Sequence, residues 1–329
     1  MKGLLSESTR RGGFGAAGGG RSFATSAAGG PKVGLTKGND RKENLWRALR
    51  LIEDDIFASI GDRQVLIKPN FVQINRQLAA TPVESVRIIL EFLRTRHKKQ
   101  ILIGESTQFQ NGTLEGYKNY GYLPLEKEYK IKPLDLNLMG SQRRYVVGEK
   151  FKPQAIRICA PFFDPNLYVI SAALLKTHQY AVASMSIKNV VMGSPLNDYN
   201  AQVNDKKLMH RGPHGDYNDI LHFNLFQIGQ EVFPNLAVID GFEGMEGQGP
   251  SNGTPIDSRV VIASVDALAA DTVGAKVMGF DPKKILYLAS MAEAGMGQGD
   301  IARMNLTGDR VEECIKPFKA PPSLRFSAV

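Results

Sequence analysis

The chain has 329 residues, 43% of them hydrophobic, and a formal net charge of +8. This length accommodates one large domain or two ordinary ones, each with a sizeable core. The charge is spread thinly along the chain and no nucleic-acid-binding motif accompanies it, so we expect no nucleic-acid partner. No apolar run approaches the roughly 20 residues of a membrane-spanning helix. With only two cysteines, Cys159 and Cys314, the chain cannot hold an iron–sulfur cluster by its own thiolates, although a disulfide between them stays open.

Residues 1–31 are predicted to form a flexible leader, because they are rich in glycine, alanine and serine and contain a single acid. The pair Arg10-Arg11 precedes a stretch of small residues, as in a twin-arginine export signal, and residues 26–28 offer a cleavage point. A disordered tail and an organelle transit peptide are the alternatives. An export signal would make the protein periplasmic or extracytoplasmic; without one it would be cytoplasmic.

Between residues 32 and 318, short apolar runs alternate with amphipathic stretches. This order predicts an α/β fold with a mainly parallel sheet and helices on both faces, built as one domain that is either undivided or two-lobed. Residues 319–329 are expected to be a tail. Strands are expected at residues 33–35, 65–67, 101–103, 167–173, 236–239 and 260–263, and helices at 43–58, 82–95, 217–232, 266–278 and 282–294.

Three segments carry more particular expectations. Thr81 is the predicted N-cap of the helix that begins at Pro82. Residues 117–157 are less regular, with two strands expected near 145–149 and 155–159. Residues 194–216 lack periodicity and are expected to be a long loop, of the kind that often serves as a lid or binding loop.

Polar side chains follow several of the predicted strands. In open α/β sheets ligands bind where strands end, so these side chains are candidate site residues. The densest cluster follows the strand at 167–173 and includes lysines that need an anionic partner or water, since uncompensated charge is not readily buried. The sequence therefore predicts a small anionic ligand, a carboxylate or a phosphate, bound by Lys68, Asn70, Glu105, Lys176, Thr177, His178, Ser186, Lys188 and Asn189.

These residue types suggest roles. The lysines would hold the anion by charge-assisted hydrogen bonds, Asn189 would orient it, and His178 would exchange a proton. The residues predicted to be catalytic are His178, Lys176 and Lys188. A glycine-rich loop at 240–253 follows another strand and adds the carboxylates Asp240 and Glu243, of which Asp240, like Glu105, would set the state of a neighbouring lysine, histidine or metal.

A divalent metal is a second possible ligand. The candidate metal ligands are His178, His210, His214 and His222, but their spacing matches no zinc signature and two of them lie in a segment rich in glycine and proline. As a metal site this pattern is weak.

Taken together, these motifs resemble the prokaryotic family catalogued as domain of unknown function 362. The resemblance rests on residues 66–70, 80–82, 104–105, 176–189 and 240–250 and covers about residues 32–318. It implies the α/β fold and the candidate site, but no reaction. A weaker likeness in element order connects the chain to the nickel-dependent lactate racemase family, in which a His/Lys site holds a nickel-bearing nucleotide cofactor.

The leading hypothesis is an enzyme that acts on a small anionic substrate or uses an anionic cofactor. The alternative is an exported accessory protein that carries a metal or cofactor to a redox partner without turnover. An interaction scaffold is a third possibility, and it predicts that substituting the lysines leaves ligand binding unchanged.

Overall fold

The computed structural model describes residues 29–108, 112–199, 202–210 and 217–322. The predicted leader up to residue 28, including its export signal, lies outside these residues, as does His214. No helix within the described ranges is long and apolar enough to cross a membrane.

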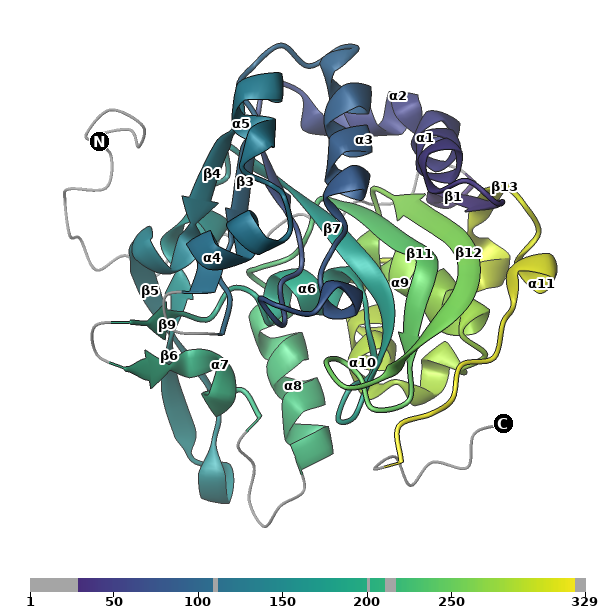
Figure 1. Cartoon of the computed structure of the whole chain (residues 1–329). Coiled ribbons are helices and arrows are strands. Elements are labelled where there is room, and N and C mark those ends of the chain that lie inside the picture. The colour runs from purple at the N-terminus through teal and green to yellow at the C-terminus, as the bar shows by residue number, and fades with distance from the viewer. Residues whose placement is uncertain (1–28, 109–111, 200–201, 211–216, 323–329) are drawn as a thin grey trace.

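A nine-stranded, mostly parallel sheet with helices on both faces confirms the predicted α/β class (Figure 1). The strand order is β13-β1-β12-β11-β7-β2-β3-β4, and β8 pairs with β7. Only β12 and β8 run antiparallel to their neighbours. The strands are β1 (Lys32–Lys37), β2 (Gln64–Lys68), β3 (Leu102–Glu105), β4 (Lys132–Asp135), β7 (Leu167–His178), β8 (Val182–Ser184), β11 (Leu236–Glu246), β12 (Thr254–Ser264) and β13 (Asn305–Gly308).

Alternate residues of the strands supply two hydrophobic cores, one on each face of the sheet. In β2, Val65 and Ile67 pack into the core beneath the first group of helices, while Leu66 packs into the opposite core. The first group is α1 (Arg41–Leu51), α2 (Glu53–Ile60), α3 (Val83–Arg94), α4 (Gly112–Asn119) and α5 (Pro124–Tyr129). The second group is α6 (Ser186–Val191), α8 (Tyr217–Gly229), α9 (Ala267–Val277), α10 (Leu286–Glu293) and α11 (Val311–Cys314).

The predicted helices are present, with changes at their ends. The helix expected at 43–58 begins earlier, where the Asp40 carboxylate accepts a hydrogen bond from the Glu43 N–H, and it breaks at Ile52 into α1 and α2. Thr81 does not cap α3, so that prediction was wrong. Its hydroxyl instead donates to the Ala172 carbonyl and accepts from the Asn70 N–H, which ties the start of α3 to β7.

Two stretches expected to be irregular contain regular structure. The two-strand segment is the antiparallel hairpin of β5 (Ser141–Val147) and β6 (Pro153–Cys159). The expected long loop instead holds the short pair β9 (Asn197–Asp198) and β10 (Val203–Asn204), followed by α7 (Asp205–Leu208). Figure 1 shows β5, β6, β9 and α7 gathered on one side of the molecule, away from β13 and α11.

The first part of the glycine-rich segment, residues 240–246, is also strand and not loop, whereas residues 247–253 form the turns between β11 and β12. β11 runs on through these glycines because β12 pairs with it antiparallel along its length, with one irregularity between Gly241 and Glu243. Beyond the sheet, the Lys319 N–H donates to the Glu246 carboxylate, so the first residues of the expected tail lie against β11. Cys159 and Cys314 are both free and buried.

Candidate functional site

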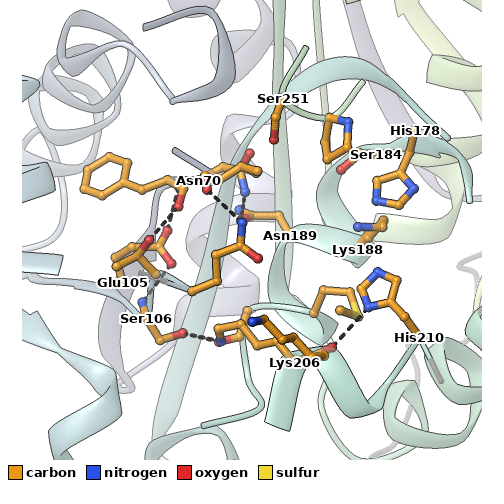
Figure 2. A pocket seen from close by; sticks show the side chains of 18 of the residues that line it. Asn70, Glu105, Ser106, His178, Ser184, Lys188, Asn189, Lys206, His210 and Ser251 are labelled. Carbon is orange, nitrogen blue, oxygen red and sulfur yellow. Dashed lines mark hydrogen bonds between the residues drawn. The ribbon is translucent and has the colours of Figure 1, made fainter. Parts of the chain in front are cut away.

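The polar residues at the ends of β2, β3 and β7 meet at one cavity, as the sequence predicted (Figure 2). These three strands are adjacent and parallel, so their carboxyl ends lie at the same edge of the sheet. The cavity has a volume of about 240 Å³. Its lining includes the predicted residues Lys68, Asn70, Glu105, His178, Lys188, Asn189 and His210, together with Ser106, Ser184, Lys206, Lys207 and others.

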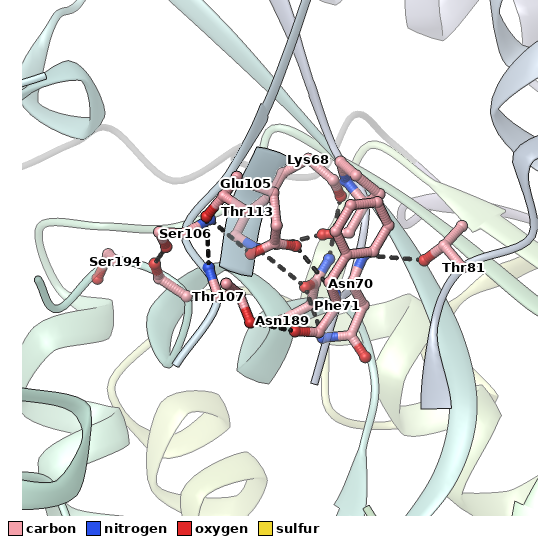
Figure 3. A network of polar contacts seen from close by, with 12 residues as sticks. Lys68, Asn70, Phe71, Thr81, Glu105, Ser106, Thr107, Thr113, Asn189 and Ser194 are labelled. Carbon is pink, nitrogen blue, oxygen red and sulfur yellow. Dashed lines mark hydrogen bonds and ion pairs between the residues drawn. The ribbon is translucent and has the colours of Figure 1, made fainter. Parts of the chain in front are cut away.

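One wall of the cavity is a closed hydrogen-bonded network (Figure 3). The Lys68 ammonium, 1% exposed, lies 2.9 and 3.0 Å from the two carboxylate oxygens of Glu105, which is 2% exposed. The same carboxylate accepts hydrogen bonds from the Phe71 and Ser106 N–H groups. Gly193 makes room for Lys68, because a Cβ there would lie 2.2 Å from the Lys68 Cε. This ion pair is therefore fully enclosed and fully hydrogen-bonded.

Asn189, on α6, extends the network toward β7. Its carboxamide oxygen accepts from the Lys68 ammonium and from Asn70, and its nitrogen donates to the Lys68 carbonyl and the Ser171 hydroxyl. Asn70 in turn accepts a hydrogen bond from the Lys176 ammonium, which also donates to the Ala79 carbonyl. Burial lowers the pKa of Lys176 to about 7, and the nearby positive charge of Lys188 acts in the same direction. Lys176 thus lies behind the cavity wall and does not line it.

The opposite wall presents unused hydrogen-bonding groups. Lys188 is only 6% exposed, yet its ammonium has no hydrogen-bond partner among the residues that the structure describes. Burial lowers its pKa to about 7. The hydroxyl of Ser184, 5% exposed and also on the lining, likewise has no partner in the described ranges. Helix α6, which carries Lys188, is held by the Asp271 carboxylate on α9, which accepts from the Ser186 and Ile187 N–H groups.

The hydrogen bonds of His178 fix its tautomer. Its Nδ1 accepts from two backbone N–H groups, those of Tyr180 and Ala181, each at 3.1 Å. A nitrogen that accepts carries no proton, so in the neutral ring the proton is on Nε2. Burial, followed by the positive charge of Lys188, lowers the pKa of His178 well below its usual value. His178 is therefore a neutral ring with an Nε2–H donor.

The segment expected to be a loop supplies His210 and the unforeseen Lys206. Lys206 is 7% exposed and donates to the Ser106 hydroxyl and to the Gly193 and Pro195 carbonyls. Its sequence signal, an adjacent pair of lysines, is typical of exposed surface, and only the formation of α7 places Lys206 inside. His210 follows α7 and lines the cavity, 6.2 Å from the His178 ring between centroids.

Two predicted carboxylates lie elsewhere. Asp240 is an interior residue of β11, and strand alternation directs it to the helix face opposite α6. There it accepts from the Ser85 hydroxyl and lies 3.2 Å from the Arg41 guanidinium. Glu243 is exposed on the same strand. The expectation that Asp240 meets the lysines was wrong, because the strand does not end where the glycines begin.

Three further candidates also have structural partners or positions away from the lining. The Thr177 hydroxyl donates to the Met245 and Gly247 carbonyls and so joins β7 to β11. Ser186 is buried at the start of α6. The His222 Nδ1 accepts from the Tyr287 N–H, and its ring stacks on that tyrosine, with a pKa lowered to about 4 mainly by burial.

No cluster of three or more histidine, cysteine, aspartate or glutamate side chains suited to a metal occurs within the described ranges. Among the histidines of the cavity, His178 offers no lone pair, because its Nδ1 is occupied by two N–H donors. His210 alone of this pair could ligate a metal through Nε2. The site is thus a cationic pocket at the carboxyl edge of an α/β sheet, with nitrogen and hydroxyl donors and few metal ligands.

Comparison with known proteins shows the family to which this α/β protein belongs. The chain belongs to the family described as "Domain of unknown function (DUF362)", whose model matches residues 65–276, more than half of the chain. This confirms the resemblance seen in the sequence. The matched range includes β3, β7, helix α6 and all of β2 except its first residue, Gln64.

Two individual proteins are similar to this chain. A thylakoid-associated protein of Synechocystis is 27% identical over 243 residues, which cover 73% of this chain and 70% of that protein. A crystal structure of a protein from Thermotoga maritima matches with a TM-score of 0.41 and 11% identity over 68% of this chain, which spans only 54% of the Thermotoga chain. The likeness to the lactate racemase family stays a prediction.

Proposed function

We propose that the cavity binds a small anionic ligand, a carboxylate or a phosphate, that serves as substrate or cofactor. The observation that carries this proposal is the Lys188 ammonium, which is nearly fully buried beside a cavity and has no hydrogen-bond partner among the described residues. An ammonium that only the cavity solvates bears part of the desolvation cost of a fully buried ion, which is several kcal/mol. An anion in the cavity would offset that cost.

The charge balance of the lining supports an anion over a cation. Four lysines line the cavity and Glu105 is the one acidic residue of that lining, and both of its oxygens already contact Lys68. The positive charge of the other lysines is therefore not neutralised by a lining carboxylate. A negatively charged ligand would complete the balance, whereas a divalent cation would worsen it.

In this proposal Lys188 supplies the charge, and the Ser184 hydroxyl and the His178 Nε2–H supply directed hydrogen bonds. In this role His178 donates a hydrogen bond to the ligand and does not take up a proton. Protonation of its Nδ1 would break the contacts of that nitrogen with two N–H groups. Burial lowers the pKa of Lys188 to about 7 in the ligand-free protein, and a bound anion would favour its charged form.

The test is a titration of the purified chain with phosphate, acetate and glycolate, followed by calorimetry and by thermal unfolding. We expect saturable binding that Lys188→Met weakens by roughly tenfold to a hundredfold, the loss of one charge-assisted hydrogen bond. Lys152→Met, at an exposed lysine, is the matched control and should bind as the parent does. Equal binding by the parent and by Lys188→Met would contradict the proposal.

The leading hypothesis of an enzyme and the alternative of an accessory protein share this binding step. They are separated by turnover of the bound acid or phosphate ester, which an enzyme shows and a carrier does not. A carrier would instead retain its ligand through purification, which native mass spectrometry detects as added mass. Export by the leader, and delivery to a redox partner, stay predictions.

A further inference from the structure

Two histidines of the cavity present opposite hydrogen-bonding groups to the same space. The rings of His178 and His210 are nearly parallel, with an interplanar angle of 18°, and Figure 2 shows Lys188 between them. His178 comes from the end of β7 and His210 from the segment after α7. Each ring has one nitrogen engaged with the backbone, which determines what the other nitrogen can do.

His178 offers a hydrogen. Since its Nδ1 accepts from the Tyr180 and Ala181 N–H groups, its Nε2 carries the ring proton.

His210 offers a lone pair. Its Nδ1 lies 3.1 Å from the Lys206 carbonyl oxygen, which can only accept, so Nδ1 carries the proton and Nε2 is bare. Burial and the positive charge of Lys188 lower the pKa of His210 to about 4, so the ring stays neutral at neutral pH. No hydrogen bond joins His210 Nε2 to another described side chain. The cavity therefore contains an acceptor as well as its cation and donors.

We infer that the site selects anions that carry a hydroxyl hydrogen of their own. This inference rests on the proposed anion site and names its ligand class: hydrogen phosphate on one hand, a hydroxy carboxylate on the other. The charged oxygens contact Lys188 and the His178 Nε2–H, and the ligand hydroxyl donates to the His210 Nε2. His210 is thus the residue that determines specificity.

The site should discriminate against anions without a hydroxyl hydrogen, because such an anion has nothing to donate to the His210 Nε2. Sulfate and acetate have lone pairs but no hydrogen at neutral pH, so either would direct an oxygen lone pair at the His210 lone pair. A site built to accept a hydroxyl hydrogen rejects the analogue that lacks it, because the buried acceptor is left unpaired.

The experiment compares two matched ligand pairs by calorimetry at pH 7.5, phosphate with sulfate and glycolate with acetate. In each pair the members differ chiefly in the presence of a hydroxyl hydrogen. We expect the hydroxyl-bearing member of at least one pair to bind roughly tenfold or more tightly. The pair that shows the larger ratio tells whether the ligand is a phosphate or a hydroxy acid.

Two variants assign the effect to His210. His210→Gln keeps a side-chain oxygen that can accept, and should retain a preference, whereas His210→Phe has no acceptor and should reduce the ratio to about one. Circular dichroism and thermal unfolding check that both variants fold. Equal affinities within both pairs, or an unchanged ratio in His210→Phe, would overturn the inference and leave the anion site standing. Failure of all four probes to bind the parent would overturn the anion site itself.

Discussion

The two walls of the cavity each contain a buried lysine, but only one of these lysines has hydrogen-bond partners. On the β2–β3 wall, Lys68 is paired with Glu105 and every polar group of the network is satisfied. On the α6 wall, Lys188 is almost as deeply buried but has no partner among the described residues. Burial of a charge therefore does not by itself mark a ligand site. The proposed anion site rests instead on unused hydrogen-bonding capacity beside a cavity, and substitutions on the two walls should separate stability from binding.

The largest effect is expected on the closed wall. Glu105→Gln keeps the shape of the side chain but removes its charge, which leaves the Lys68 ammonium buried and uncompensated. We expect a loss of about 3–5 kcal/mol in the free energy of unfolding, measured by urea denaturation.

The matched control is Glu231→Gln, which breaks an exposed ion pair with Arg144 and should cost less than about 1 kcal/mol. The double variant Lys68→Met with Glu105→Gln removes both charges but keeps an amide oxygen that can accept from the Phe71 or Ser106 N–H, so it should recover part of the loss. A Glu105→Gln variant as stable as the parent would show that the two walls do not differ in the way described.

The convergence of Lys68, Glu105 and the polar residues at the end of β7 was predictable from sequence, because each follows an apolar run and adjacent parallel strands end at one edge. The hydrogen-bond partners of each polar group were not predictable. Sequence order does not reveal that Asn189 uses both ends of its carboxamide within the network, or that Lys176 donates to Asn70. These contacts depend on where α6 and the segment before α3 pack.

Fold elements were missed for similar reasons. The edge strands β4 and β13 are short and carry mixed polar residues, so they have no apolar run to detect. α7 has four residues, fewer than a periodic pattern requires, and its burial of Lys206 depends on contact with Ser106 and Gly193. The continuation of β11 through its glycines is imposed by pairing with β12, which overrides local propensity.

A second test concerns His222, a satisfied histidine outside the cavity lining. Its pKa of about 4 lies below the roughly 6.5 of an unfolded chain, so as pH falls the unfolded state takes up the proton first. Stability present above about pH 6.5 should be lost progressively down to about pH 4, by as much as about 3 kcal/mol. His222→Gln, which keeps an acceptor for the Tyr287 N–H, should show a smaller loss over that window. An identical pH profile for the two proteins would contradict the assignment.

On the open wall the sign of the stability effect should reverse. Lys188→Met removes an unpaired buried ammonium and keeps a side chain of similar length, so we expect the ligand-free protein to gain about 1–2 kcal/mol at pH 7. Because burial sets the pKa of Lys188 near 7, below its value in the unfolded chain, the gain should shrink as pH rises from about 7 to 10.5. Denaturation at pH 7 and pH 10 measures both points. Destabilisation by this variant in the absence of ligand would place Lys188 with the structural lysines.

The smallest expected effect on stability is that of a substitution at Thr177. Thr177 stands between Lys176 and His178, yet its hydroxyl donates to carbonyls of β11 and the segment after it, away from the cavity lining. Thr177→Val keeps the shape of the side chain and removes these donors, so it should cost about 1 kcal/mol of stability. Anion affinity, measured by calorimetry, should not change. A loss of affinity comparable to that of Lys188→Met would mean that the β7–β11 junction positions the cavity, and that the division into a structural and a binding wall is drawn in the wrong place.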